Sequence, residues 1–210
     1  GDNGDIQSHL DFTGRLINRA AEIMRAHATH VTGTIGGAGI IQELYEGYAP
    51  KVTLLTQYYS GIFSNAPAYI QDYGMVITNN SFGTVTDDCF YNGLYDLTSR
   101  ILDQQAIDLP ELQQVFASGN NGTLNCAPYP AGFRTVLGGY QSAKNVLTVG
   151  STNYQSNVSS FSSRGPVRDG RLKPEIMSMG EFTASTWTSN AYSYNNGTSM
   201  AAPGVSGGLA

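Results

Sequence analysis

Charged side chains are scarce in this chain. Asp, Glu, Lys and Arg make up 13% of its 210 residues, and the formal net charge is −5. Phosphate groups bind to a basic face, so this charge balance argues against a nucleic-acid partner. Long apolar runs are missing as well, and no segment has the roughly 20 apolar residues that a membrane-spanning helix needs.

Cysteine is nearly absent, and so are the marks of targeting or of a second domain. The two cysteines, Cys89 and Cys126, show no Cys-x-x-Cys spacing and have no third zinc ligand beside them. No signal peptide is recognisable, so we expect a mature, trimmed or partial chain. The sequence is 40% apolar, holds 25 glycines and shows no repeat or linker, so we expect residues 1–210 to form one loop-rich domain.

Apolar runs alternate with helical patterns through the middle of the chain. Helices are expected where apolar residues recur at helical spacing, and strands where short apolar runs occur. The expected helices are 66–73 and 91–107, and the expected strands are 52–56, 75–78, 112–117 and 145–150. This alternation predicts an α/β fold of three layers, with a mostly parallel sheet between helices. Ligands of such sheets bind beyond the carboxyl ends of the strands.

A helix start with two hydroxyl groups lies near the end of the sequence. Gly197 is followed by Thr198, Ser199 and small residues that favour a helix, and Pro203 falls in the first turn, where proline costs little. Unpaired N–H groups and the positive end of the helix dipole gather there, so negative charge beside Ser199 would be stabilised. An N-capped helix without catalytic chemistry explains this segment equally well when it is taken alone.

The same segment carries a resemblance. Residues 197–203, GTSMAAP, are similar to the nucleophile motif of the subtilisin-like serine proteases (subtilases), although Gly204 replaces the usual histidine. The resemblance implies the subtilisin-like α/β fold with Ser199 as nucleophile. It also implies an aspartate, a histidine and an oxyanion donor upstream, in the chain order Asp, His, Ser.

The first twelve residues, GDNGDIQSHLDF, resemble the aspartate segment of the family. Asp2 matches better than Asp5, because counting from Asp2 places His9 and Asp11 at the family's spacing. Asn3 stands where the family has Ser or Thr, and residue 10 is leucine where it has proline. The apolar strand that precedes the family's aspartate is absent, so the domain is expected to be incomplete at both ends.

Residues 26–37, AHATHVTGTIGG, resemble the histidine motif, with Ala28 for glycine and Thr32 for alanine. The resemblance implies that His27 is the general base and that His30 is structural. A metal-binding pair is the alternative, because histidines at i and i+3 share a helix face. The zinc protease motif instead has glutamate after the first histidine and i, i+4 spacing.

Two predicted strand ends resemble the substrate groove of the family. The residues Ser81, Phe82 and Gly83 match the segment whose backbone pairs with substrate. In the segment 117–122, Asn120 matches the oxyanion donor, and Ala117, Ser118 and Gly119 precede it as an apolar pocket wall. Each segment taken alone reads as a Gly/Asn turn.

A further match lies at 161–176, where FSSRGP is followed by LKPEI. In the family this segment is scaffold. Residues 177–180, MSMG, depart from the family pattern there.

The ordered motifs imply a secreted serine endopeptidase that acts on polypeptides through an Asp-His-Ser triad and an acyl-enzyme. A propeptide or protein inhibitor is a further implied partner. No cofactor or metal is implied for catalysis. Structural calcium is a family expectation, although no acidic loop shows clear ligand spacing and Asp87-Asp88 reads as a solvated turn. The alternative function is a non-catalytic subtilase scaffold used for binding.

The resemblance also gives a context for the two cysteines. Cys89 follows the Ser81–Gly83 strand end and Cys126 follows Asn120. Loops that leave neighbouring strand ends can bring two alpha carbons within the ~4.4–6.8 Å of a disulfide, which an extracellular protease would retain. Two buried free thiols remain the alternative, since free cysteine is among the most buried residue types.

Overall fold

The computed structural model describes residues 1–2, 6, 8–20 and 24–210. Its main sheet is parallel and has the strand order β3 (Ile77–Asn80), β4 (Gln113–Ala117), β5 (Leu147–Thr152) and β6 (Ile176–Met179). Two smaller sheets are the parallel pair β1 (Leu16–Asn18) and β2 (Leu54–Thr56), and the antiparallel pair β7 (Thr183–Thr186) and β8 (Tyr192–Asn195). A cavity of about 360 Å³ lies between β2 and β3 and is lined by residues of both strands.

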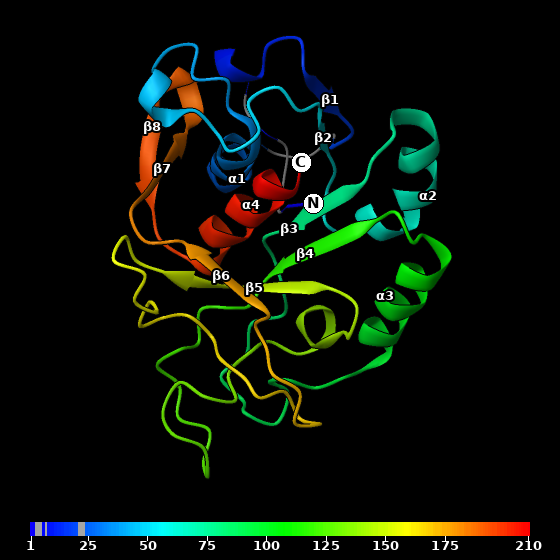
Figure 1. Ribbon diagram of the computed structural model, residues 1–210, viewed down its shortest axis with the longest axis vertical. Helices are drawn as coiled ribbons and strands as arrows, with labels where there is room; N and C mark the ends of the chain where they lie inside the picture. Colours follow the sequence, from blue (N-terminus) through cyan, green and yellow to red (C-terminus); the bar gives the residue numbers. More distant parts are fainter. Residues whose placement is uncertain (3–5, 7, 21–23) are drawn as a thin grey trace.

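Helices cover both faces of the main sheet (Figure 1). The helices α1 (Ala26–Gly36) and α4 (Thr198–Leu209) pack against each other, and α4 contacts all four strands of the sheet. The opposite face carries α2 (Ile62–Tyr73) and α3 (Leu97–Asp108). Short 3-10 turns complete the chain at η1 (Leu10–Phe12), η2 (Glu43–Tyr45), η3 (Gly139–Ser142) and η4 (Thr188–Asn190). The predicted three-layer α/β fold is confirmed.

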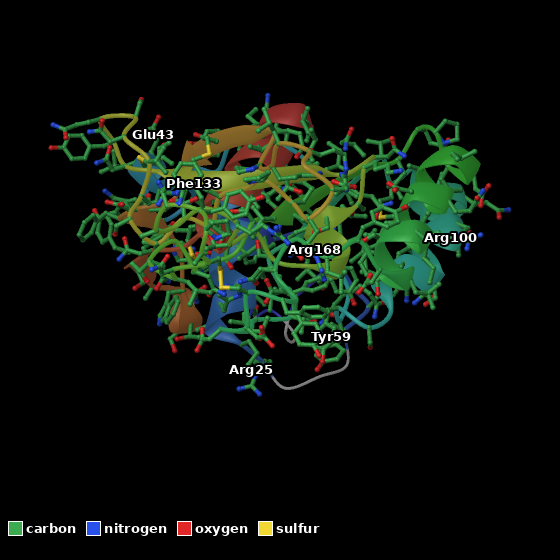
Figure 2. The ribbon with its side chains drawn as sticks, turned by 90° about the horizontal axis from the view of Figure 1, so that it is seen from below. Arg25, Glu43, Tyr59, Arg100, Phe133 and Arg168 are labelled. Carbon is green, nitrogen blue, oxygen red and sulfur yellow. A yellow bond between two sulfur atoms is a disulfide. The ribbon has the colours of Figure 1, made fainter. Side chains whose placement is uncertain are left out.

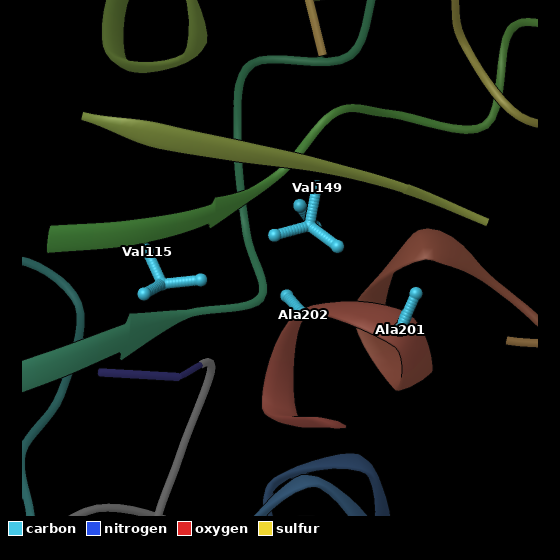
Figure 3. Packing of buried hydrophobic residues seen from close by; sticks show 5 residues of the cluster. Val115, Val149, Ala201 and Ala202 are labelled. Carbon is cyan, nitrogen blue, oxygen red and sulfur yellow. The ribbon is translucent and has the colours of Figure 1, made fainter. Parts of the chain in front are cut away.

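The alternation of side chains along β4 explains the two cores. Val115 and Ala117 point to one face, where they pack with Val149 against Ala201 and Ala202 of α4 (Figure 3). The intervening residue of β4, Phe116, is buried on the other face with Leu102 of α3 and Phe63 of α2. A strand buried on both faces reads as a continuous apolar run, which is the pattern that predicted it.

The predicted strands 52–56, 75–78, 112–117 and 145–150 correspond to β2, β3, β4 and β5, and the helix 66–73 lies within α2. The prediction of one helix over 91–107 is wrong in its first part. The helix α3 begins only at Leu97, because Asp96 caps it: the Asp96 carboxylate accepts from Ser99 N at 3.1 Å. Before the cap, Gly93 has a φ of +66°, which an α-helix cannot contain.

The loops that follow β3 and β4 are joined covalently beyond the sheet. Cys89 and Cys126 form a disulfide with alpha carbons 5.5 Å apart, which confirms the predicted pairing and rules out two free thiols (Figure 2, yellow bond). Because 37 residues separate the two cysteines, the bond restricts a long loop that begins beside the Ser81–Gly83 segment.

None of the helices in the described part of the chain has both the length and the apolar character needed to cross a bilayer.

Candidate active site

An aspartate and a histidine meet at the amino end of α1. His27 lies in the first turn of that helix, and its Nδ1 is 2.9 Å from Asp2 Oδ1. The Asp2 backbone continues beside β2, since Asp2 N donates to Gln57 O at 3.2 Å and Tyr59 N donates to Asp2 O at 2.9 Å. Asp2 is buried. The backbone pairing therefore fixes the carboxylate against the His27 ring, while the alternative Asp5 lies outside the described residues.

The surroundings of His27 act on its pKa in two directions. Burial disfavours the charged ring, whereas the hydrogen bond and the negative charge of Asp2 favour it. The contribution of Asp2 prevails and raises the pKa of His27 above 6.5. With Nδ1 directed at the carboxylate, the neutral ring carries its proton on Nδ1 and leaves Nε2 as the proton acceptor.

His30 lies one turn later in α1 and is fully buried. Its Nε2 lies 3.0 Å from Thr183 O and 3.1 Å from Ser193 O, so it donates to the β7–β8 hairpin. Burial lowers the pKa of His30 to about 4, and the ring is neutral at physiological pH. This is the structural role that the sequence predicted for His30, and it opposes a metal-binding pair with His27.

Among the residues that the structure describes, no group of three or more His, Cys, Asp or Glu side chains could hold a metal ion. Structural calcium stays a prediction.

Ser199 is the second residue of α4, directly after the turn made by Gly197. Gly197 has a φ of +147°, a conformation open to glycine and strained for other residues. Ser81 Oγ donates to Ser199 O at 2.9 Å, and Ser199 Oγ donates to Ser81 O at 3.3 Å. These bonds tie the start of α4 to the end of β3 and keep the Ser199 hydroxyl at the helix amino end.

Asn120 faces the same helix end from the loop after β4. Its Oδ1 accepts from Thr198 N at 2.9 Å and from Thr198 Oγ1 at 3.0 Å. With Oδ1 held by two donors, the Nδ2 group is directed toward the Gly197–Ser199 turn, and a Cβ placed on Gly197 would lie 3.6 Å from it. An oriented amide donor thus lies beside the serine.

The segment 161–176 does more than pack the scaffold. Ser163 braces the Asn120 loop, because its N donates to Gly119 O at 3.0 Å and its Oγ accepts from Asn121 N at 2.9 Å. Ser162 Oγ accepts from Ser151 N of β5 at 2.9 Å and anchors the brace to the sheet. The sequence placed this segment in the scaffold but carried no sign of which loop it supports.

The two predicted groove segments are neighbours, since β3 and β4 pair with Asn80 opposite Phe116. The fully buried Gln141 joins their ends: its Nε2 donates to Phe82 O at 2.8 Å and to Ala117 O at 3.0 Å. Gln141 lies in η3, and no motif of the sequence marks it.

Packing explains why residue 204 is glycine rather than the histidine that is usual in the nucleophile motif. A Cβ at this position would lie 2.7 Å from Ser178 Oγ and 3.4 Å from the Tyr48 ring. Tyr48 and β6 occupy the space that a larger side chain on α4 would need, so glycine is the residue that fits.

Comparison with known proteins places this chain in one family. A sequence profile of the subtilase family matches residues 15–210. Subtilisin DY of Bacillus licheniformis is 30% identical over 229 residues, covering 100% of this chain and 73% of that protein. Alkaline protease 1 of Aspergillus clavatus is 28% identical over 98% of this chain, which spans about half (49%) of that relative's length.

Solved structures of proteases share the fold of this chain. The prenylagaramide maturation protease PagA has a TM-score of 0.69 and 25% identity, covering 98% of this chain and 70% of that one. The Clostridium perfringens CspB protease has a TM-score of 0.75 at 15% identity, covering 98% of this chain and 79% of that one, and shows the fold alone. The chain belongs to the subtilase family of serine endopeptidases.

Proposed function

We propose that this chain is the catalytic part of a secreted protease that cleaves polypeptides through Asp2, His27 and Ser199. The observation that carries the proposal is the 2.9 Å bond between Asp2 and His27 at the start of α1, a helix that packs against the helix bearing Ser199. A serine hydroxyl is a poor nucleophile at neutral pH and needs such a base.

In the proposed reaction, His27 takes the Ser199 proton as Oγ attacks the scissile carbonyl. His27 then returns that proton to the leaving amine, and water hydrolyses the resulting acyl-enzyme by the same route. Asp2 holds the ring with Nδ1 protonated and stabilises the imidazolium. Asn120 Nδ2 and Ser199 N donate to the oxyanion at the positive end of α4.

The substrate is proposed to bind as an extended strand along Ser81, Phe82 and Gly83. Ser81 O accepts from Ser199 Oγ at 3.3 Å, a long bond for a hydroxyl donor. A substrate N–H bound to Ser81 O would compete for this acceptor and release the Ser199 hydroxyl toward His27. A propeptide or protein inhibitor would use the same strand edge. The Cys89–Cys126 disulfide supports an oxidising, extracellular setting.

The competing proposal is a subtilase scaffold that binds proteins without cleaving them. A fluorophosphonate probe separates the two, because it reacts with an activated serine and not with an ordinary hydroxyl. We expect the full-length protein to be labelled at Ser199, located by peptide mass spectrometry, and the His27→Ala variant to lose the label. A folded full-length protein that takes up no label would support the binding scaffold.

The oxyanion role of Asn120 gives a separate prediction. Asn120→Ala removes the donor while the hydroxyl and base remain, so kcat should fall about 10²–10³-fold, the loss known for the corresponding donor of subtilisin, with little change in KM. Steady-state kinetics on a peptide substrate measure both. Asn145→Ala, at an exposed position, serves as the matched control. A large rise in KM with normal kcat would show instead that Asn120 only positions substrate.

A further inference from the structure

The start of α4 lies between two strand ends. Ser81, after β3, bonds to Ser199 O at 2.9 Å, and Gly119 N, after β4, donates to Thr198 Oγ1 at 3.2 Å. A peptide bond attacked by Ser199 therefore has its acyl residue, the residue that supplies the carbonyl, over the gap between these two ends. What fills that gap decides which side chain the acyl residue can carry.

Each strand end presents a glycine to the gap, and one side chain lies against both. A Cβ placed on Gly119 would lie 2.6 Å from Leu137 Cγ, and a Cβ placed on Gly83 would lie 2.9 Å from Leu137 Cδ1. Carbon atoms in contact lie about 3.5–4.0 Å apart, so the leucine occupies space behind both glycines. Behind Gly83 it shares that space with Gln141, whose Nε2 would lie 2.6 Å from the added Cβ. Leu137 is 3% exposed, as expected for a side chain enclosed by both walls.

Leu137 is held in place by its backbone. Its N donates to Ser118 O at 3.1 Å, and its O accepts from Ser142 Oγ at 3.0 Å. The next residue is as tightly confined, since a Cβ on Gly138 would lie 2.3 Å from Tyr91 O.

The walls on either side cannot separate easily. Gln141 Nε2 bonds to Phe82 O at 2.8 Å and to Ala117 O at 3.0 Å, and so ties one wall to the other. A large substrate side chain would have to displace Leu137 or break this bridge. Both responses cost free energy because the interior is close-packed.

We propose that Leu137 sets the cleavage preference of this protein by filling the base of its first pocket, so that the acyl residue is small: glycine, alanine or serine. This inference rests on the proposed function and adds its substrate class. Leu137 acts as a specificity-determining residue and takes no part in bond making.

The test uses the full-length protein and three peptides that differ only in the acyl residue: alanine, leucine or phenylalanine. For the natural protein, kcat/KM should be at least about tenfold higher with alanine than with phenylalanine, the scale set by a few methylene groups in a pocket. Leu137→Ala should raise the phenylalanine-to-alanine ratio of kcat/KM about tenfold or more. A ratio within one preparation is independent of how much of the variant is folded.

Leu112→Ala is the matched control, because Leu112 is also a buried leucine and lies just before β4, at the opposite end of that strand. It should leave the ratio unchanged. Leu137→Val provides a milder truncation should the alanine variant fail to fold, and it should shift the ratio in the same direction.

A preference of the natural protein for phenylalanine or leucine would overturn the inference, as would an unchanged ratio in both Leu137 variants. Either result leaves the proposed protease function standing. Hydrolysis of none of the peptides, together with absence of fluorophosphonate labelling, would overturn the proposed function and this inference with it.

Discussion

Replacing Ser199 by alanine should lower kcat for peptide hydrolysis by roughly 10⁶-fold, the loss known for the nucleophile of subtilisin itself, while the protein stays folded. The substitution removes only the hydroxyl, whose bond to Ser81 O is 3.3 Å long, and it places a strong helix former in the first turn of α4. Peptide hydrolysis and thermal unfolding of the full-length variant measure the two effects.

Ser206→Ala is a matched control in the same helix. The Ser206 hydroxyl is buried and donates to Asn79 Oδ1 at 3.0 Å and to Ala202 O at 3.2 Å. Its removal should therefore lower the free energy of unfolding more than removal of the Ser199 hydroxyl does. We expect Ser206→Ala to lower the melting temperature and to keep most of the rate. A Ser199→Ala protein that retained most of the rate would show that a different group is the nucleophile.

Local patterns were enough to predict much of the fold. The run Val115-Phe116-Ala117 is apolar because two cores flank the sheet, and a short apolar run is therefore a reliable sign of a parallel strand. The apolar spacing over 91–107 was misleading, since the Asp96 cap and the Gly93 turn override it. The strands β1 and β6 were not predicted, because neither contains a buried residue and their sequences, LIN and IMSM, form no continuous apolar run.

In the candidate site, too, some residues could be predicted from local sequence motifs and others could not. Asp2, His27, Asn120 and Ser199 belong to motifs with fixed spacing, and their positions in the sequence were sufficient to select them. The partners that orient them are distant: Ser163 lies 42 residues from Asn121, and Gln141 lies 59 residues from Phe82. Serine and glutamine are common at many positions, so without the tertiary structure their role in bracing the groove could not be inferred.

The cleavage preference that we propose for Leu137 could not be predicted from the sequence either. The residues Phe82 and Ala117–Gly119 indicated an apolar pocket, but the residue that we propose closes it comes from a loop between β4 and β5 that carries no motif. The proposal that Leu137 fills part of that pocket depends on its close approach to Gly83 and Gly119, which only the tertiary structure shows.

Asp2→Asn should lower kcat/KM by about 10⁴-fold at neutral pH. An asparagine can keep the 2.9 Å contact to His27 Nδ1, yet its amide can donate to that nitrogen and favour the tautomer with the proton on Nε2. His27 would then direct a protonated Nε2 at Ser199, whereas the proposed reaction needs an unprotonated Nε2 that can accept the Ser199 proton. Asp87→Asn, in an exposed turn, is the matched control and should leave kcat/KM unchanged.

The pH dependence provides an independent readout of the same pair. The proposed mechanism needs neutral His27, so kcat/KM of the natural protein should fall as the pH drops through the pKa of His27, which Asp2 raises above 6.5. In Asp2→Asn the raising charge is gone and burial of the ring remains, so the pKa should fall and the acid limb should move to lower pH. The pH profile of kcat/KM and the NMR titration of the His27 ring should shift together. An unchanged acid limb in Asp2→Asn, or a rate within tenfold of the natural protein, would mean that Asp2 does not control the base.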